Sequence, residues 1–268
     1  ARAGGEIVVL LNDDVVPQPD FLEQHLHAHR RLGRPAMVLG ASPWRRPADE
    51  TVFDRMIADT SMIFFYDRMR PGRWYGFRHA WNLNLSLPRA VAASERFDES
   101  LGPFFFEDLE LAYRLERRHA IRVWYQAGAV AEHAHRYTLA GYLERERKLG
   151  AASLDLWRCN PDCYRAVYGA SPGDLALEYE RYVERESRFE RERLAALRSL
   201  AARRVDAFRG DDELLADIVR VAYHAHLPLK RLAFRRGFLT RWQRQPTRGP
   251  TAADLGAVGP HHSPAAMT

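Results

Sequence analysis

The sequence predicts a mixed α/β fold followed by a helical region. Apolar runs of strand length alternate with helical periodicity over residues 1–137, whereas residues 138–244 follow helical periodicity throughout. The composition indicates a folded chain, because 46% of the 268 residues are hydrophobic and the net charge is only +5. Residues 245–268, rich in proline, glycine, alanine and threonine, are predicted to form a disordered tail.

The first strand is predicted at Ile7–Leu11, since five consecutive apolar residues are typical of a strand buried on both faces of a mostly parallel sheet. Apolar side chains then recur at helical spacing over residues 21–29, and Gly33 and Pro35 end that helix. Further strands are predicted at residues 37–40, 121–125 and 129–131, with a helix beginning near Glu107. In the helical region, Ser171 and Pro172 form a helix-start signal.

Hydropathy, charge and cysteine content exclude several classes of protein. No apolar run approaches the roughly 18 residues of a spanning helix, and no secretion signal is visible. The 40 basic and 35 acidic residues are interleaved, which argues against a nucleic-acid partner. Cys159 and Cys163 are too few for a disulfide framework or a zinc site, so we expect reduced thiols and a cytoplasmic protein.

One basic segment leaves two interpretations open. Residues 227–244 combine arginines and Lys230 with leucine and aromatic residues and contain no acid. An interfacial helix on the anionic inner face of a membrane would have this composition. So would a basic helix that covers the core with its aromatic side chains packed inward. Pro228 and Gly237 argue against one continuous helix.

An asparagine and two acidic residues, Asn12, Asp13 and Asp14, follow the first predicted strand. Ligands of open α/β sheets bind at the carboxyl ends of strands. Adjacent carboxylates there need a cation or donors, and Mg²⁺ or Mn²⁺ suits their oxygen atoms. The alternative is a simple turn in which Asp14 caps the following backbone.

Two further patterns carry ionisable groups. Glu107 and Asp108 follow three phenylalanines at a helix start, where the helix dipole would keep an acid deprotonated as a general base; acids also merely stabilise such positions. His133 and His135 follow an extended segment, so only one of them can face a given site. A neutral imidazole can complete a carboxylate metal site, although an isolated histidine is more often a surface residue.

In their order and spacing these motifs resemble glycosyltransferase family 2, the inverting nucleotide-sugar enzymes of GT-A fold. The resemblance covers about residues 5–150 and rests on residues 12–14, 84–89, 97–99, 107–108, 113–115, 133–135, 138–139, 142, 145 and 150. It implies that Asp14 is a metal ligand and that Asp13 lies near the metal or the sugar nucleotide. It also implies that His133, or else His135, joins the metal or diphosphate shell. Asn12 departs from the family pattern, in which many members have aspartate.

The same resemblance implies that Asp108 deprotonates the acceptor hydroxyl, with Glu107 beside it, and that Asn84 and Ser86 line the cleft near the sugar or acceptor. The implied activity is metal-dependent, inverting transfer of a sugar from a nucleoside diphosphate sugar to a glycan or lipid-linked acceptor. A truncated, non-catalytic binding module and a metal-dependent nucleotidyltransferase remain as alternatives.

The implied fold is the C-terminal part of a GT-A (Rossmann-like) domain at residues 1–137 with a helical extension at residues 138–244. Nothing in the sequence matches the family's N-terminal half, which supplies most contacts to the base and ribose. We therefore expect an N-terminally truncated enzyme that binds nucleotide sugar weakly and is inactive or impaired alone.

Overall fold

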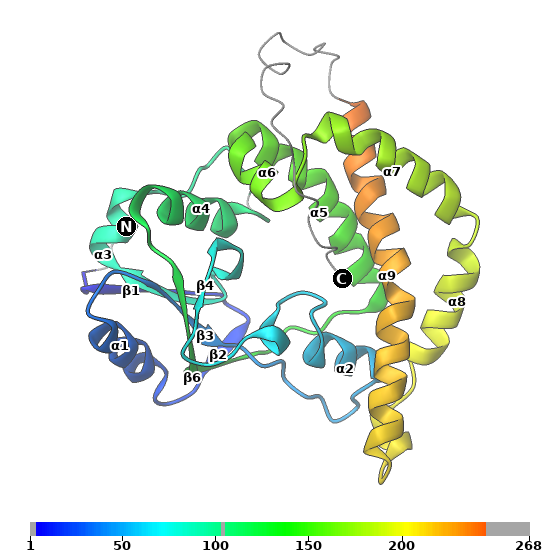
Figure 1. Ribbon diagram of the computed structural model, residues 1–268. Helices are drawn as coiled ribbons and strands as arrows, with labels where there is room; N and C mark the ends of the chain where they lie inside the picture. Colours follow the sequence, from blue (N-terminus) through cyan, green and yellow to red (C-terminus); the bar gives the residue numbers. More distant parts are fainter. Residues whose placement is uncertain (1–3, 103–104, 245–268) are drawn as a thin grey trace.

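A six-stranded mixed sheet and a set of long helices make up the chain in the computed structural model, which describes residues 4–102 and 105–244 (Figure 1). The predicted mixed α/β class is confirmed at this level. The tail predicted at residues 245–268 lies outside the described residues. No helix in the described part is long and apolar enough to cross a membrane.

The sheet has the strand order β1-β5-β3-β6-β2, and β4 pairs with β6 beside this path. The strands are β1 (Ile7–Leu11), β2 (Val15–Pro17), β3 (Met37–Ala41), β4 (Trp74–Tyr75), β5 (Asn84–Pro88) and β6 (Val123–His133). Strand β6 joins the two segments predicted at residues 121–125 and 129–131. The pair β3·β6 is parallel, and the other described pairs are antiparallel, so the predicted mostly parallel sheet is wrong.

Strand β1 is an edge strand and not, as predicted, a strand buried on both faces. It pairs with β5, its first four residues are half-buried, and Leu11 is exposed. Its residues are all apolar because alternate side chains pack against two different hydrophobic clusters, one on each face of the sheet. Val9 packs towards Phe21 on one face, and Leu10 packs towards the cluster on the other face.

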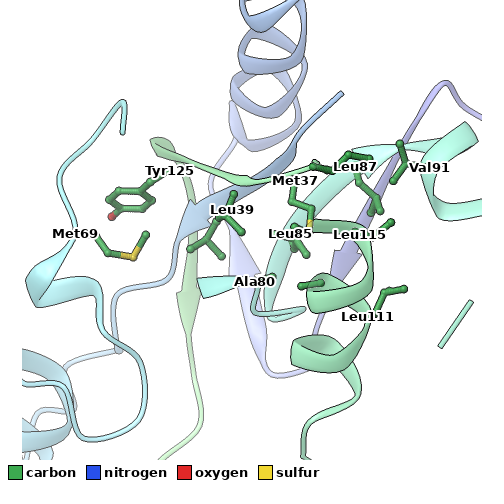
Figure 2. Close-up of a cluster of buried hydrophobic side chains, with 13 residues drawn as sticks. Met37, Leu39, Met69, Ala80, Leu85, Leu87, Val91, Leu111, Leu115 and Tyr125 are labelled. Carbon is green, nitrogen blue, oxygen red and sulfur yellow. The ribbon is translucent and has the colours of Figure 1, made fainter. Parts of the chain in front are cut away.

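Helices cover both faces of the sheet. Helix α1 (Phe21–Leu32) contacts β6 and β3 and ends at Gly33, whose φ of 59° suits glycine, as predicted. Helix α4 (Glu107–His119) covers the other face, where its Leu111 and Leu115 join a buried cluster from β3, β5 and β6 (Figure 2). The short helix α3 (Arg89–Ser94) follows β5.

The helical region begins after β6, as predicted, and comprises α5 (Leu139–Cys159), α6 (Pro161–Tyr168), α7 (Pro172–Ser187), α8 (Glu190–Ala201), a 3₁₀ turn (Val205–Phe208) and α9 (Asp212–Gln243). Ser171 caps α7 in a capping box with Asp174. The core crosses the boundary predicted at residue 137, because Met56 of α2 (Val52–Asp59) packs with Tyr142 of α5 and Leu197 of α8.

Helix α9 is continuous through Pro228 and Gly237, contrary to the prediction (Figure 1). The glycine serves packing here. A Cβ on Gly237 would lie 1.8 Å from the Arg147 carbonyl oxygen of α5, and one on Gly150 would lie 1.9 Å from the Phe234 carbonyl oxygen of α9. The two helices therefore touch backbone to backbone at this point.

The basic part of α9 faces the protein with its apolar residues. Leu229, Leu232, Phe238 and Leu239 are buried. Its arginines make ion pairs with acids of neighbouring helices, namely Arg235 with Glu178, Arg236 with Glu190 and Arg241 with Asp155. This is the arrangement of the second interpretation, a basic helix that covers the core. Contact with a membrane stays a prediction.

Candidate functional site

Asp14 and His133 meet where β2 pairs with the end of β6. The Asp14 Oδ2 atom lies 3.2 Å from His133 Nε2, and Ala134 N donates to the Asp14 carbonyl oxygen. His133 is 4% exposed, and its ring stacks on Trp44 with 3.9 Å between ring centroids. Burial lowers the pKa of His133 more than the neighbouring Asp14 raises it, so the imidazole is neutral at pH 7.

This pair leaves polar atoms without hydrogen-bond partners. Asp14 Oδ1 and His133 Nδ1 are both buried and have no partner among the described residues. Buried polar atoms in proteins are nearly always hydrogen-bonded, so these two atoms have unused hydrogen-bonding capacity. Asp13 is exposed, and His135 is exposed and packs on Tyr137. Of the two candidate histidines, His133 is the one that contacts Asp14.

The fit of a divalent ion depends on how many ligands the protein supplies. Within the described residues, no group of three or more His, Cys, Asp or Glu side chains could hold a metal ion. Mg²⁺ is typically bound by one or two carboxylates together with substrate phosphates. Asp14, whose Oδ1 is unpartnered, and the neutral His133 therefore fit an ion shared with a substrate, but not an ion held by protein alone.

The second acidic pair begins helix α4 after two strained residues. Phe105 and Phe106 have φ values of 76° and 71°, in the left-handed region that bulky residues rarely adopt. Each such residue costs on the order of 1–3 kcal/mol, and such strain clusters at functional sites. Phe106 is buried against a cluster that includes Tyr164, which holds the turn. The packing of Phe106 thus holds the strained turn that precedes Glu107 and Asp108.

Asp108 differs from the prediction in its protonation. Its Oδ1 accepts a hydrogen bond from Leu109 N at 2.7 Å, and its Oδ2 accepts one from Asn82 N at 3.5 Å. Burial, followed by repulsion from Glu107, raises the pKa of Asp108 to about 7. The helix dipole was expected to keep an acid here ionised, but desolvation is the larger effect. At neutral pH the carboxyl is therefore near its midpoint, which suits a group that takes up a proton.

Glu107 adds a second perturbed acid. Burial raises the pKa of Glu107, and its Oε2 atom has no hydrogen-bond partner among the described residues. Two neighbouring acids with raised pKa values are typical of functional sites, although structural pairs also show such shifts.

The backbone of Asn82 and Leu83 connects the end of β1, which leads to Asp14, with Asp108. Asn12 N donates to the Leu83 carbonyl oxygen at 3.4 Å, just before Asp14. Asn82 N donates to Asp108, as described above. Pairing of Leu11 with Asn84 brings this segment beside the end of β1. The structure thus brings the C-terminal end of β1, His133 at the C-terminal end of β6, and Asp108 to the same end of the strands.

Aromatic side chains fill the space around this segment. The Phe64 ring lies 5.1 Å from Trp81 and 6.0 Å from His133, measured between centroids, and Trp44 stacks on the same histidine. Trp44, Phe64 and Trp81 belong to none of the motifs identified from the sequence. Their clustering depends on long-range packing, so the sequence offered only their composition as a signal.

Asn84 and Ser86 do not join this site, contrary to the prediction. Both are fully buried on the face of β5 opposite Leu85 and Leu87, which pack towards α4. The Asn84 side chain bonds to His25 and to the carbonyl oxygens of Ala41 and Ala129. Ser86 Oγ bonds to His25 Nδ1 and His29 Nε2. Their polar atoms hold α1 on the sheet and are not available to a substrate.

No protein-family model and no curated protein matches this chain. The relation to glycosyltransferase family 2 therefore stays a prediction from the motifs.

Proposed function

We propose that this chain carries the acceptor-activating and metal-binding part of a metal-dependent inverting glycosyltransferase of family 2 with a GT-A fold. One observation supports this proposal most. Asp108, with a pKa of about 7, accepts a hydrogen bond from Asn82 N, and Asn12, two residues before Asp14 of the Asp14–His133 pair, donates to the carbonyl oxygen of the adjacent Leu83. Sugar transfer needs a base and a site for a departing diphosphate close together, and this arrangement offers both.

Asp108 would act as the general base. Its carboxylate takes the proton from the acceptor hydroxyl, whose oxygen attacks the anomeric carbon of the donor sugar. The bond between that carbon and the diphosphate oxygen breaks, the diphosphate leaves with the electron pair, and the configuration at the carbon inverts. A positioned base of this kind contributes about 10²–10⁴-fold to the rate. Glu107 keeps the Asp108 proton affinity high by repulsion.

Asp14 and His133 would hold the cofactor. Bound Mg²⁺ or Mn²⁺ stabilises the charge that develops on a leaving diphosphate. The neutral state of His133 leaves a ring nitrogen lone pair, and the unpartnered Asp14 Oδ1 leaves a carboxylate oxygen. The Trp44 ring against His133 excludes water from one side of the pair. Asp13, which is exposed beside this pair, stays a proposed contact to the sugar nucleotide.

The test is a transfer assay with a panel of nucleoside diphosphate sugars and Mn²⁺ at high donor concentration, with products identified by mass spectrometry. We expect Asp108→Asn to lower the transfer rate by about 10²–10⁴-fold while Mn²⁺ binding is kept. Asp14→Asn should weaken Mn²⁺ binding, measured by electron paramagnetic resonance. Asp217→Asn is the matched control, because Asp217 is an exposed acid on α9.

Two outcomes would contradict the proposal. A near-normal rate in Asp108→Asn would remove the base from the mechanism. Release of pyrophosphate from a nucleoside triphosphate, without transfer from any diphosphate sugar, would instead favour the nucleotidyltransferase.

A further inference from the structure

A half-buried lysine of the helical region, Lys230, contacts the segment that carries Phe64. Lys230 Nζ of α9 donates to the Met62 carbonyl oxygen at 3.0 Å, and Tyr142 Oη of α5 donates to the same oxygen at 3.5 Å. Tyr142 and Met62 are at most 2% exposed. Burial lowers the pKa of Lys230, while Glu146 opposes that shift. Placing an ammonium group there costs desolvation, which a purely apolar contact would avoid.

The carbonyl that these donors hold lies two residues before Phe64. Phe64 is half-buried in a cluster with Val15, which follows Asp14, and with Leu83, which follows Asn82. Its ring also contacts Trp81 and His133. One side chain therefore touches neighbours of the metal-binding pair and of the backbone that bonds Asp108. A shift of the backbone at Met62 would be transmitted to this ring.

We propose that Lys230 is a positioning residue for the site: together with Tyr142 it fixes the Met62 carbonyl group and thereby holds Phe64 between His133 and Trp81. This inference rests on the proposed function, because it assigns helices α5 and α9 a part in positioning the proposed catalytic site. The contact itself is independent of any substrate. The chain contains one other lysine, Lys148, which is exposed on α5 and serves as the control.

The experiment is ¹⁹F NMR of the full chain labelled with 5-fluorotryptophan, without substrate. The six tryptophans give separate probes, each assigned by replacement with phenylalanine. Trp44 and Trp81 lie against Phe64, whereas Trp74 and Trp124 pack on each other away from it and report the rest of the sheet. Lys230→Met should shift or broaden the Trp44 and Trp81 resonances and leave Trp74 and Trp124 unchanged.

Two variants sharpen this expectation. Lys230→Arg, which keeps a donor, should return the Trp81 resonance towards its original position, and Phe64→Leu should reproduce the pattern of Lys230→Met. Lys148→Met should leave all six resonances in place. A folded Lys230→Met protein with unmoved Trp44 and Trp81 resonances, or with equal shifts at Trp74 and Trp124, would overturn the proposal.

If Lys230→Met fails to fold, Tyr142→Phe replaces it, because it removes only one hydroxyl from the same carbonyl. The same two resonances then decide: a selective shift supports the positioning role, and no shift contradicts it. Because no substrate is present, failure here would leave the transfer proposal standing, and failure of the transfer assay would leave this contact standing.

Discussion

Two buried polar clusters lie on the same sheet and differ in how fully their atoms are bonded. Under α1, the polar side-chain atoms of His25, Asn84 and Ser86 all have partners at 2.8–3.0 Å. At the end of the strands near α4 and β2, Asp14 Oδ1, His133 Nδ1 and Glu107 Oε2 have no hydrogen-bond partner among the described residues. The first cluster completes its own hydrogen bonds, whereas the second leaves capacity for a ligand.

This difference separates polar residues that complete the fold from polar residues with unused hydrogen-bonding atoms, a distinction that residue type alone does not make. Asn84 and Ser86 are as polar as the residues of the candidate site. All their polar atoms are hydrogen-bonded, so these residues stabilise the fold. Removing one of them would leave its buried partners without a hydrogen bond. An acid with free oxygens contributes less to stability and can be replaced at small cost or even with gain.

The largest effect is expected at Asn84. Asn84→Ala should lower the free energy of unfolding by roughly 3–5 kcal/mol, since His25 and the carbonyl oxygens of Ala41 and Ala129 would all lose a partner. Chemical denaturation followed by circular dichroism measures this change. Asn12→Ala, at the exposed asparagine before Asp14, is the control and should change stability by less than about 0.5 kcal/mol. Equal effects would erase the distinction between the clusters.

An effect of opposite sign is expected at Asp108. The folded pKa of about 7 lies above the ordinary value of 3.8, so the folded state binds the proton more tightly and stability falls as pH rises through this window. Asp108→Asn should therefore raise the free energy of unfolding at pH 8, by at most about 4 kcal/mol, and change it little at pH 4. Denaturation at both pH values tests this. A loss of stability at pH 8 would place Asp108 with the structural cluster.

A smaller effect on stability is expected at His29 of α1, which faces β5. Burial and the neighbouring His25 lower the pKa of His29 to about 4 from 6.5, so the unfolded state binds its proton more readily between those values. This stability is present above pH 6.5 and is lost as pH falls towards 4. His29→Gln should reduce the loss between pH 7 and pH 5 by about 2 kcal/mol. An unchanged pH dependence would show that His29 is not buried in its neutral form.

Local patterns predicted several elements, and long-range packing decided the rest. The helix at residues 21–29 and the strand at residues 37–40 were predictable, because their periodicity and the glycine at position 33 act locally. The edge position of β1 was not, because an apolar run does not reveal how many neighbours a strand has. Gly237 suggested a break in α9, yet it permits the close contact with Arg147.

The site was predicted in the same uneven way. Asp14, His133 and Asp108 could be chosen because acids and histidines at element ends form a recognisable order. The contact between the first two residues was found only in the fold. The raised pKa of Asp108 could not be predicted, because burial, which depends on surrounding side chains, outweighs the local helix dipole. Asn84 and Ser86 were assigned to the site because the sequence does not reveal which face of the sheet their side chains on β5 occupy.

The pH dependence of sugar transfer tests the central claim most directly. The rate of transfer from a nucleoside diphosphate sugar should rise with pH as Asp108 ionises, with an apparent pKa of about 7. This rise, the acidic limb of the pH–rate profile, should disappear in Asp108→Asn. A rate that is independent of pH between about 5 and 8, or an Asp108→Asn variant that keeps both the rate and the limb, would contradict the account.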